Sequence, residues 1–320
     1  MLQSLDAVDR RILYELDRNA RQSNAELGKK IRHSKEFVNF RIKRLEEQGI
    51  ITGYRTMVNT IKLGYYPIMI HFKFQNMTPE LEKQFGEYFV KDQRTYWVGP
   101  MLGAHDFDVG YWIKDISAYK KIHASYMEKF KHVIKEVITL FLTEFTTYGK
   151  NYLYSKGHKA NFPAIPGEKS IIDEVDVKIL EILAGNARIP VTEIAQLTGL
   201  SPNTIIYRIR NLEKQKIILG YRCNIDTHKL GMTYWKVELI LDDYSKLNQL
   251  NEYFKLSPYL IYSYHSTGGS DLELEFDTHG YDHLKEIISK SQQMYPGVIR
   301  EWRAILFPGW LKERFFPTGN

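Results

Sequence analysis

The sequence contains almost no cysteine. Cys223 is the single cysteine among 320 residues, so the chain can form no internal disulfide and lacks the cysteine–histidine spacing of a structural zinc site. We therefore expect a reducing, cytoplasmic setting. No apolar run approaches the ~18 residues that a membrane span requires. The first residues also lack the basic-then-apolar order of a secretion signal, and we expect no membrane partner.

The excess of one charge is also small. Lys and Arg number 44 against 38 Asp and Glu, which gives a formal net charge of +6. Such a mild basic excess is compatible with a nucleic-acid or other anionic partner but does not require one. Hydrophobic residues make up 43% of the chain and aromatic residues 13%, which excludes global disorder. At ~150 residues per domain, the length allows about two or more domains.

The chain contains a long internal repeat. Residues 5–64 align without a gap on residues 172–231, and about 25 of the 60 aligned positions are identical. Chance does not produce such a match, so we infer a duplication. Residues 103–122 align more loosely on residues 268–287. The pattern predicts two alternating modules, with winged helix-turn-helix domains at 1–62 and 171–229, ferredoxin-like regulatory domains at 63–153 and 230–320, and a linker at 154–170.

The first module of each half has the pattern of three helices followed by a β-rich wing. Asp6 and Asp173 are placed to cap the first helix, and Ser201 followed by proline is a typical start for the third. Two turns lack a favourable cap glycine. Arg32 stands where the second repeat has Gly199, and Lys216 stands where the first has Gly49. Each costs about 1 kcal/mol if the site needs a positive φ.

The third helix decides the functional interpretation of this module. Between positions 29 and 44, seven Lys and Arg stand against one Glu, whereas positions 196–216 hold four against one. A helix-turn-helix places this helix in the major groove of DNA. A solvated basic face or a protein-contact role remains the alternative. The candidate DNA-binding residues are Arg32, Lys35, Asn39, Arg41, Lys43, Arg44, Ser201, Asn203, Tyr207, Arg208, Arg210 and Lys214.

The second module of each half predicts a small α/β sheet. Residues 68–74 and 234–241 alternate like strands, and the following segments give the order β-α-β-β-α-β of a ferredoxin-like fold. The fold class is therefore α+β. The helices cover one sheet face, so a second sheet must cover the other, from the same chain or from another. The aromatic residues expected on that face are Tyr66, Tyr96, Trp97, Trp112, Tyr234, Trp235, Tyr262 and Tyr264.

These segments resemble the Lrp/AsnC, or feast/famine, family of transcriptional regulators. The resemblance is carried by LDAVDRRIL, by SKEFVNFRIKRLEEQGIITGY with its second copy, and by GAHDFDV and GGSDLEL. It implies double-stranded DNA as partner, a homodimer or larger assembly through the regulatory domains, and a small effector such as an amino acid. The implied effector-binding residues, which equally fit a plain hairpin turn, are Gly103, His105, Asp106, Gly268, Gly269, Ser270 and Asp271.

Two other functions compete with a sequence-specific regulator. Sirohaem decarboxylases also resemble Lrp-type proteins, some as two fused halves, and would use His105 and His265 as acid–base groups. The basic third helix argues against that enzyme. A nucleoid-organising protein with little sequence preference shares the same charge pattern. We nominate no catalytic residue, no cofactor and no metal site, because His279 and His283 have no evident third ligand, and we expect that the protein is not an enzyme.

Overall fold

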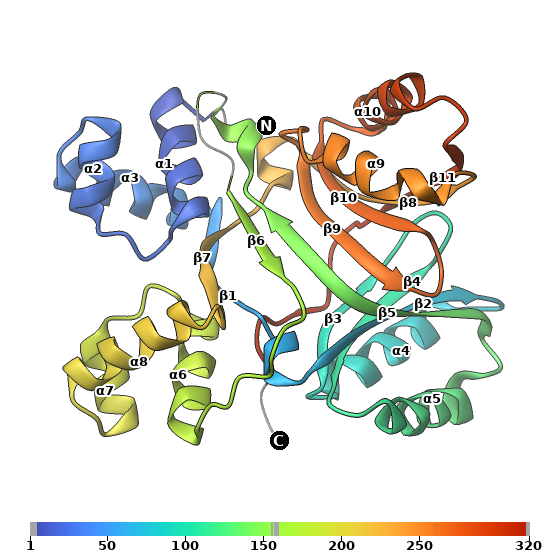
Figure 1. The fold of residues 1–320 in the computed structure, drawn as a ribbon, viewed down its shortest axis with the longest axis horizontal. Helices are drawn as coiled ribbons and strands as arrows, with labels where there is room; N and C mark the ends of the chain where they lie inside the picture. Colours follow the sequence, from blue (N-terminus) through green and yellow to red (C-terminus); the bar gives the residue numbers. More distant parts are fainter. Residues whose placement is uncertain (1–4, 155, 157–159, 318–320) are drawn as a thin grey trace.

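A computed structural model describes residues 5–154, 156 and 160–317 of the chain. The ends of the outermost predicted domains (1–4 and 318–320), and positions 155 and 157–159 of the predicted linker, lie outside the described residues. Figure 1 shows two small helical heads on one side and a large β-sheet body with its own helices on the other. This arrangement is the predicted α+β fold, in which two winged helix-turn-helix heads alternate along the chain with two ferredoxin-like units.

Each head consists of three helices whose starts follow the sequence signals. Asp6 accepts a hydrogen bond from the Asp9 amide, Asp173 from the Asp176 amide, and Ser201 from the Thr204 amide. The caps predicted from sequence are thus confirmed. The first head comprises α1 (Ala7–Arg18), α2 (Asn24–Ile31) and α3 (Lys35–Glu47), and the second comprises α6 (Glu174–Gly185), α7 (Val191–Thr198) and α8 (Pro202–Lys214).

Each head has its predicted wing strand, but the sequence did not show what that strand pairs with. The strands that follow the third helices, β1 (Ile51–Val58) and β7 (Ile218–Ile225), pair with each other as an antiparallel two-stranded ribbon. Arg55 lies opposite Arg222, its equivalent in the repeat. A strand of this composition satisfies its backbone equally well in a local hairpin or against a distant copy of itself, so the local pattern does not reveal the partner.

The body contains the two predicted β-α-β-β-α-β units. Each four-stranded sheet has its two long helices on one face. The first unit comprises β2 (Tyr66–Phe74), α4 (Pro79–Lys91), β3 (Thr95–Pro100), β4 (Phe107–Ile113), α5 (Ile116–Phe130) and β5 (Ile134–Tyr148). The second comprises β8 (Thr233–Leu241), α9 (Leu247–Phe254), β9 (Leu260–Thr267), β10 (Leu272–Thr278), α10 (Tyr281–Met294) and β11 (Ile299–Leu306).

The two units pair within the one chain. Strand β5 pairs with β9, and the short strand β12 (Lys312–Glu313) pairs with β3, so that the described strands of both units belong to one continuous sheet. An isolated bridge between Leu102 and Leu306 adds a further contact between the halves. The sequence does not determine whether the two sheets pair within one chain or between two chains. In the structure they pair within one chain.

Part of the predicted linker is structured. Residues Asn161–Ala164 form strand β6, which pairs with β5. Phe162 and Ala164 are buried, whereas Asn161 and Pro163 are exposed. The surrounding glycines, prolines and lysines are typical of a linker and conceal this short alternating pattern in the sequence.

Two of the aromatic residues assigned to the sheet-covering face lie elsewhere. Tyr66 is 43% exposed at the start of β2. Trp235 faces the helix side of its sheet, with its ring centroid 5.7 Å from that of Tyr281 in α10. Its neighbour Tyr234 points to the opposite face, since successive strand residues alternate.

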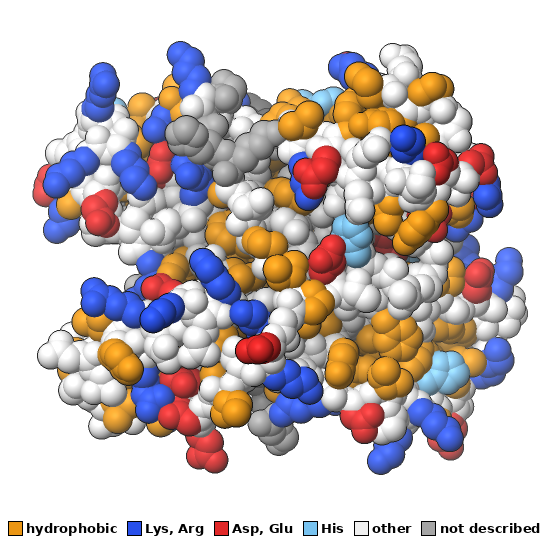
Figure 2. All heavy atoms as spheres, viewed as in Figure 1, with side chains coloured by type: hydrophobic (Ala, Val, Ile, Leu, Met, Phe, Trp, Pro, Cys, Tyr) orange, Lys and Arg blue, Asp and Glu red, His pale blue; other side chains and the backbone are white. Residues whose placement is uncertain are grey.

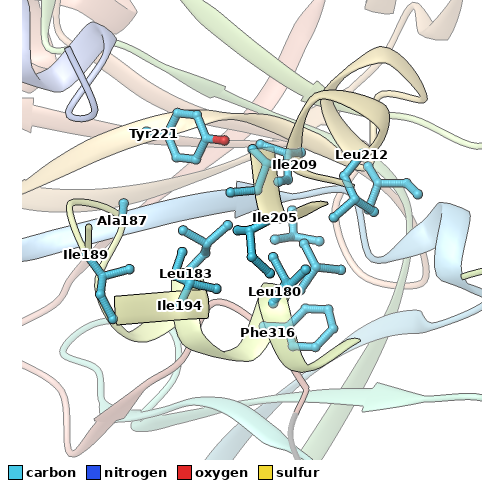
Figure 3. Packing of buried hydrophobic residues seen from close by; sticks show 14 of the residues in the cluster. Leu180, Leu183, Ala187, Ile189, Ile194, Ile205, Ile209, Leu212, Tyr221 and Phe316 are labelled. Atoms are coloured by element: carbon cyan, nitrogen blue, oxygen red, sulfur yellow. The ribbon is translucent and has the colours of Figure 1, made fainter. Parts of the chain in front are cut away.

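The core of the second head includes residues from distant parts of the chain. Leu180, Leu183 and Ile205 pack between α6 and α8 (Figure 3). Ala20 and Val58, from the first half, belong to the same buried cluster, as does Phe316 near the C-terminus. The heads therefore do not form independent cores, and their positions are set by packing against the rest of the chain.

The unusual turns give a stability prediction. Lys216 has φ of 58°, a left-handed conformation that favours glycine. Replacing it, Lys216→Gly, is expected to raise the free energy of unfolding by about 0.5–1 kcal/mol, measured by urea denaturation followed by circular dichroism. The matched control is Gly199→Ala, where φ is 72° and an added Cβ meets no atom within 4 Å. Gly199→Ala should lower the free energy of unfolding by a similar amount. Unchanged urea midpoints for both variants would contradict the view that these turns favour glycine.

Candidate functional site

The exposed face of α3 carries the strongest positive charge of the two heads. Arg32, Lys35 and Lys43 are exposed, together with Asn39 and the 63% exposed ring of Phe40. Figure 2 shows Lys and Arg side chains over this head. Within the described part of the chain, Arg32 and Lys35 make no ion pair, and Lys43 has only a 3.7 Å contact to exposed Glu47. These cations are available to phosphate or base edges.

Three of the predicted DNA-binding arginines are instead occupied within their own heads. The Arg41 guanidinium lies 2.6 Å from Asp6 and 3.1 Å from Asp9, and Arg44 also pairs with Asp9. Arg208 repeats this arrangement with Asp173 and Asp176 at 2.8 and 2.9 Å. The Asp9 amide and Arg41 lower the pKa of Asp6. These arginines fasten the third helix to the start of the first helix.

The exposed face of α8 has a different chemistry. Asn203, Arg210 and Lys214 are exposed, and the Tyr207 ring is 71% exposed. The Ser201 hydroxyl serves as the helix cap and lies 2.8 Å from the Thr204 hydroxyl. The two third helices therefore present unlike surfaces, one strongly basic and one mixed polar and aromatic.

The heads are also joined directly to each other. The Arg21 guanidinium donates to the carbonyl oxygens of Ala187 and Ile189 at 2.6 and 3.2 Å. Its equivalent in the repeat, Arg188, donates to Asn24 at 2.6 Å. Together with the β1–β7 ribbon, these reciprocal contacts fix the relative position of the two heads.

The aspartates of the predicted effector turns have structural roles. Asp106 accepts hydrogen bonds from the Phe74 amide and the Lys73 ammonium, both at 2.7 Å. Asp271 accepts one from the Leu241 amide, also at 2.7 Å. Each aspartate thus connects its turn to the end of a neighbouring strand, as the hairpin alternative requires.

The glycines of these turns lie at the seam between the two halves. Gly103 has φ of 137° and lies against the Ala304 carbonyl, and Gly268 has φ of 92° and lies against the Thr139 carbonyl. Gly269 contacts Leu140, and Ser270 donates to Glu273 at 3.3 Å. A side chain at Gly103 or Gly268 would collide with the opposing backbone, so both positions favour glycine for packing reasons.

A buried polar cluster lies at the centre of the body, and the sequence did not identify it. His105 does not face solvent but lies 2.9 Å from Glu238, and the ring centroid of His71 is 4.7 Å from that of His105. Lys236 and Asp108 complete the cluster. A histidine at an inward position of an otherwise apolar strand was the available signal. His265, the other histidine considered for an enzyme, lies apart, against Asn251 and Glu144.

A small cavity of about 130 Å³ lies beside this cluster, between the two sheets. Tyr96, Tyr264 and Trp112 contribute aromatic walls, and Thr56–Val58 of β1 forms the wall toward the heads. Glu275 is the buried acid of the cavity and accepts a hydrogen bond from Tyr234. Burial raises the pKa of Glu275 to about 7, although Lys236 and two tyrosine hydroxyls act to lower it.

Glu275 predicts a pH-dependent stability. Its folded-state pKa of about 7 exceeds the ordinary 4.5, so its contribution is fully present below pH 4.5 and declines as the pH rises through 7. Relative to Glu275→Gln, the wild type should therefore lose up to about 3 kcal/mol of unfolding free energy between pH 4.5 and 8. Urea denaturation of both proteins across this range measures the difference. For the exposed control Glu286→Gln, the difference in unfolding free energy from the wild type should not change with pH. Parallel pH profiles of the wild type and Glu275→Gln would contradict the raised pKa of Glu275.

Comparisons with known proteins agree with this architecture. A family model for the AsnC-type helix-turn-helix domain matches residues 172–213, and one for winged helix-turn-helix DNA-binding domains matches residues 5–52. The proline dehydrogenase transcriptional activator of Rhodobacter capsulatus is 34% identical over 131 residues, covering 40% of this chain and 85% of the activator. LrpA of Pyrococcus horikoshii is 32% identical over 136 residues, which cover 42% of this chain and 96% of LrpA.

These matches define the class and then the family. The chain is a winged helix-turn-helix protein with paired ferredoxin-like domains. It belongs to the Lrp/AsnC family of transcriptional regulators. Most of each relative's length aligns with about two-fifths of this chain, which is consistent with two family units in one polypeptide.

Solved structures of one protein are similar along nearly the whole chain. The sirohaem decarboxylase NirDL has a TM-score of 0.67, with 98% of this chain and 95% of that chain covered, at 12% sequence identity. At this identity the likeness concerns the fold, and it supports the tandem arrangement of heads and sheets. No helix within the described residues is long and apolar enough to cross a membrane.

Proposed function

We propose that this protein is a sequence-specific transcriptional regulator that reads two unlike DNA half-sites with the two heads of one chain. The observation that carries the proposal is the pair of complete heads, fixed by one ribbon, whose exposed third helices differ. In this proposal Lys35 and Asn39 of α3, and Asn203 and Arg210 of α8, read base edges. Arg32, Lys43 and Lys214 contact phosphate, and Tyr207 lies beside them on α8.

In-vitro selection from a random duplex pool at ~150 mM salt tests the proposal, because this salt weakens purely ionic binding. We expect an enriched site with two unlike half-sites. Lys35→Ala should relax one half-site and Asn203→Ala the other, each with a cost of about 1–3 kcal/mol. Lys290→Ala, a solvent-exposed change on α10, serves as the control. Perfect inverted repeats would contradict unlike heads, and binding without enrichment would support nucleoid packing instead.

We further propose that a small effector binds in the cavity between the sheets. An apolar cavity of about 150 Å³ accepts a single benzene ring in another protein, so the cavity of about 130 Å³ suits a compact apolar ligand with one polar group facing Glu275. Its β1 wall belongs to the ribbon that carries the heads, so a ligand there would act on their spacing. This site replaces the glycine–aspartate turns as our preferred effector location, because those turns are occupied by contacts between the halves.

A thermal-shift survey of amino acids and single-ring aromatics tests the effector site. A ligand that binds only the folded chain should raise the melting temperature by a few degrees at ~100-fold excess over its dissociation constant. Met57→Phe, which fills the β1 side of the cavity, should abolish the shift, whereas Ser270→Ala in the turn should retain it. The reverse result would restore the turn as the effector site, and no shift with any compound would contradict the proposal.

A sirohaem-decarboxylase activity is the second candidate, favoured by the fold likeness to NirDL and by the buried histidine pair. The cavity of about 130 Å³ is smaller than the ~300–1,000 Å³ of sites for drug-sized ligands, so it does not hold a tetrapyrrole as it stands. A neighbouring cavity of about 440 Å³, lined by Arg55, Trp97 and Asp277 among others, lies within that range. The absorption spectrum of the purified protein distinguishes the two functions. A tetrapyrrole band would favour the enzyme, and a colourless protein that selects DNA would favour the regulator.

A further inference from the structure

Three side chains with metal-binding atoms converge at the centre of the body. His71 comes from β2, His105 from the turn before β4, and Glu238 from β8 of the other half. They are 1%, 5% and 4% exposed, and their donor atoms all lie within 4.8 Å of one another. Glu238 Oε1 lies 2.9 Å from His105 Nε2 and 3.5 Å from His71 Nδ1. Ligand atoms of a tetrahedral site with bonds of about 2.0–2.1 Å stand about 3.3 Å apart.

The charge of the cluster favours an added cation. Asp108, Glu238 and Glu273 are buried carboxylates, and Lys236 is the buried ammonium that faces them. Lys236 lies 2.6 Å from Glu273. Arg303, 37% exposed, approaches Glu238 only to 3.8 Å. Buried carboxylates are stabilised by pairing or by metal coordination, and here the carboxylates outnumber the buried cation.

Asp108 gives a second and independent indication. It is fully buried, yet neither carboxylate oxygen accepts a hydrogen bond within the described part of the chain. Its Oδ1 lies 3.6 Å from Nε2 of His71, on the ring edge opposite to Glu238. A metal-bound histidine commonly donates its second ring N–H to a carboxylate, which orients the ring. Asp108 is placed for that role.

The two nitrogens of His71 show how the site would rearrange. In the structure, Lys236 Nζ lies 3.0 Å from Nε2, so the ring accepts there and its Nδ1–H faces Glu238. A metal ion on Nδ1 would move the proton to Nε2, which would then donate to Asp108 and no longer accept from Lys236, so the Lys236 ammonium would have to turn away from the ring. Lys236 would keep its pair with Glu273. Ion binding therefore exchanges one tautomer of His71 for the other.

We propose that His71, His105 and Glu238 bind one divalent transition-metal ion of the kind that prefers imidazole and carboxylate ligands, such as Zn²⁺. Two ligands belong to the first half of the chain and one to the second, so the ion links the two sheets at their seam. The inference concerns the body alone and does not depend on DNA recognition. No metal-ligand spacing is visible in the sequence, because the three ligands come from three separate segments.

The test uses the full-length chain without a polyhistidine tag, freed of metal with a chelator and then dialysed. Titration with Zn²⁺ should show one ion per chain, and Co²⁺ should give visible absorption bands. His71→Gln and His105→Gln should each weaken binding at least about tenfold, and Asp108→Asn about 10–100-fold. The matched control His265→Gln removes a histidine that lies outside the cluster and should bind as the wild type does. Equal weakening by His265→Gln, or wild-type binding no tighter than that of His105→Gln, would overturn the proposal.

A measurement on the wild type covers the case in which a buried variant does not fold. Nitrogen-15 NMR of the ten histidines should show two ring signals, from His71 and His105, that change on addition of one equivalent of Zn²⁺. The thermal midpoint should rise with Zn²⁺ concentration, since the ion binds the folded chain. Unchanged ring signals, or changes confined to exposed histidines such as His33, would overturn the proposal.

Discussion

The antiparallel pairing of β1 with β7 is the contact on which the rest of the structure depends. The ribbon joins the two heads through equivalent strands, and Arg55 and Arg222 face each other near its centre. Arg222 is fully buried and pairs with Asp17 of α1 at 2.6 Å, and Arg55 reaches Glu313 and Tyr262 of the body. The ribbon thus acts together with the Arg21 and Arg188 contacts and with the shared core of the second head to position the two heads. One chain thus builds the two-fold arrangement that two identical chains would otherwise supply.

Duplication within one chain also allows the two halves to diverge. Arg222 pairs with Asp17 of the first half. The position equivalent to Asp17 in the second half is Ala184, which has no carboxylate. Arg55, the equivalent of Arg222, therefore pairs with Glu313 in the C-terminal segment. In the body, the register pairs His71 with Asp108 in one half and Glu238 with Glu273 in the other. His71 and its equivalent Glu238 lie 3.5 Å apart across the seam between the halves, where two identical chains would bring together two copies of the same residue. The same freedom gives α3 and α8 their different faces.

The sequence predicted features that depend on neighbouring residues. The helix caps at Asp6, Asp173 and Ser201 follow from a few adjacent positions. Comparison of the two repeats showed that Arg32 and Lys216 replace glycine, and both residues adopt the left-handed conformation. The order of strands and helices in the body follows from apolar periodicity. These features held because local backbone geometry does not depend on distant partners.

Contacts between residues far apart in the chain could not be predicted from the sequence. Arg41 meets Asp9 across 32 positions, and β1 meets β7 across the repeat. The Arg41–Asp9 pair recurs in the second repeat as Arg208–Asp176. The presence of both residues in both repeats favours an ion pair over DNA contact. His105 was assigned to an effector turn, but its partner Glu238 lies 133 positions away. Composition and spacing do not determine which inward-facing polar side chains meet.

In this structure the ribbon holds two unlike heads at a fixed distance from each other. The most direct measurement is the affinity of the full chain for a selected site whose half-sites are moved apart in steps of one base pair. We expect the affinity to fall sharply when about five base pairs are inserted, because one half-site then turns to the opposite face of the duplex. It should not recover at a full helical turn of ~10–10.5 base pairs, because heads held at a fixed distance cannot follow a half-site that has moved by ~34–36 Å. An affinity that is independent of the spacing would show that the heads move freely and would contradict the account.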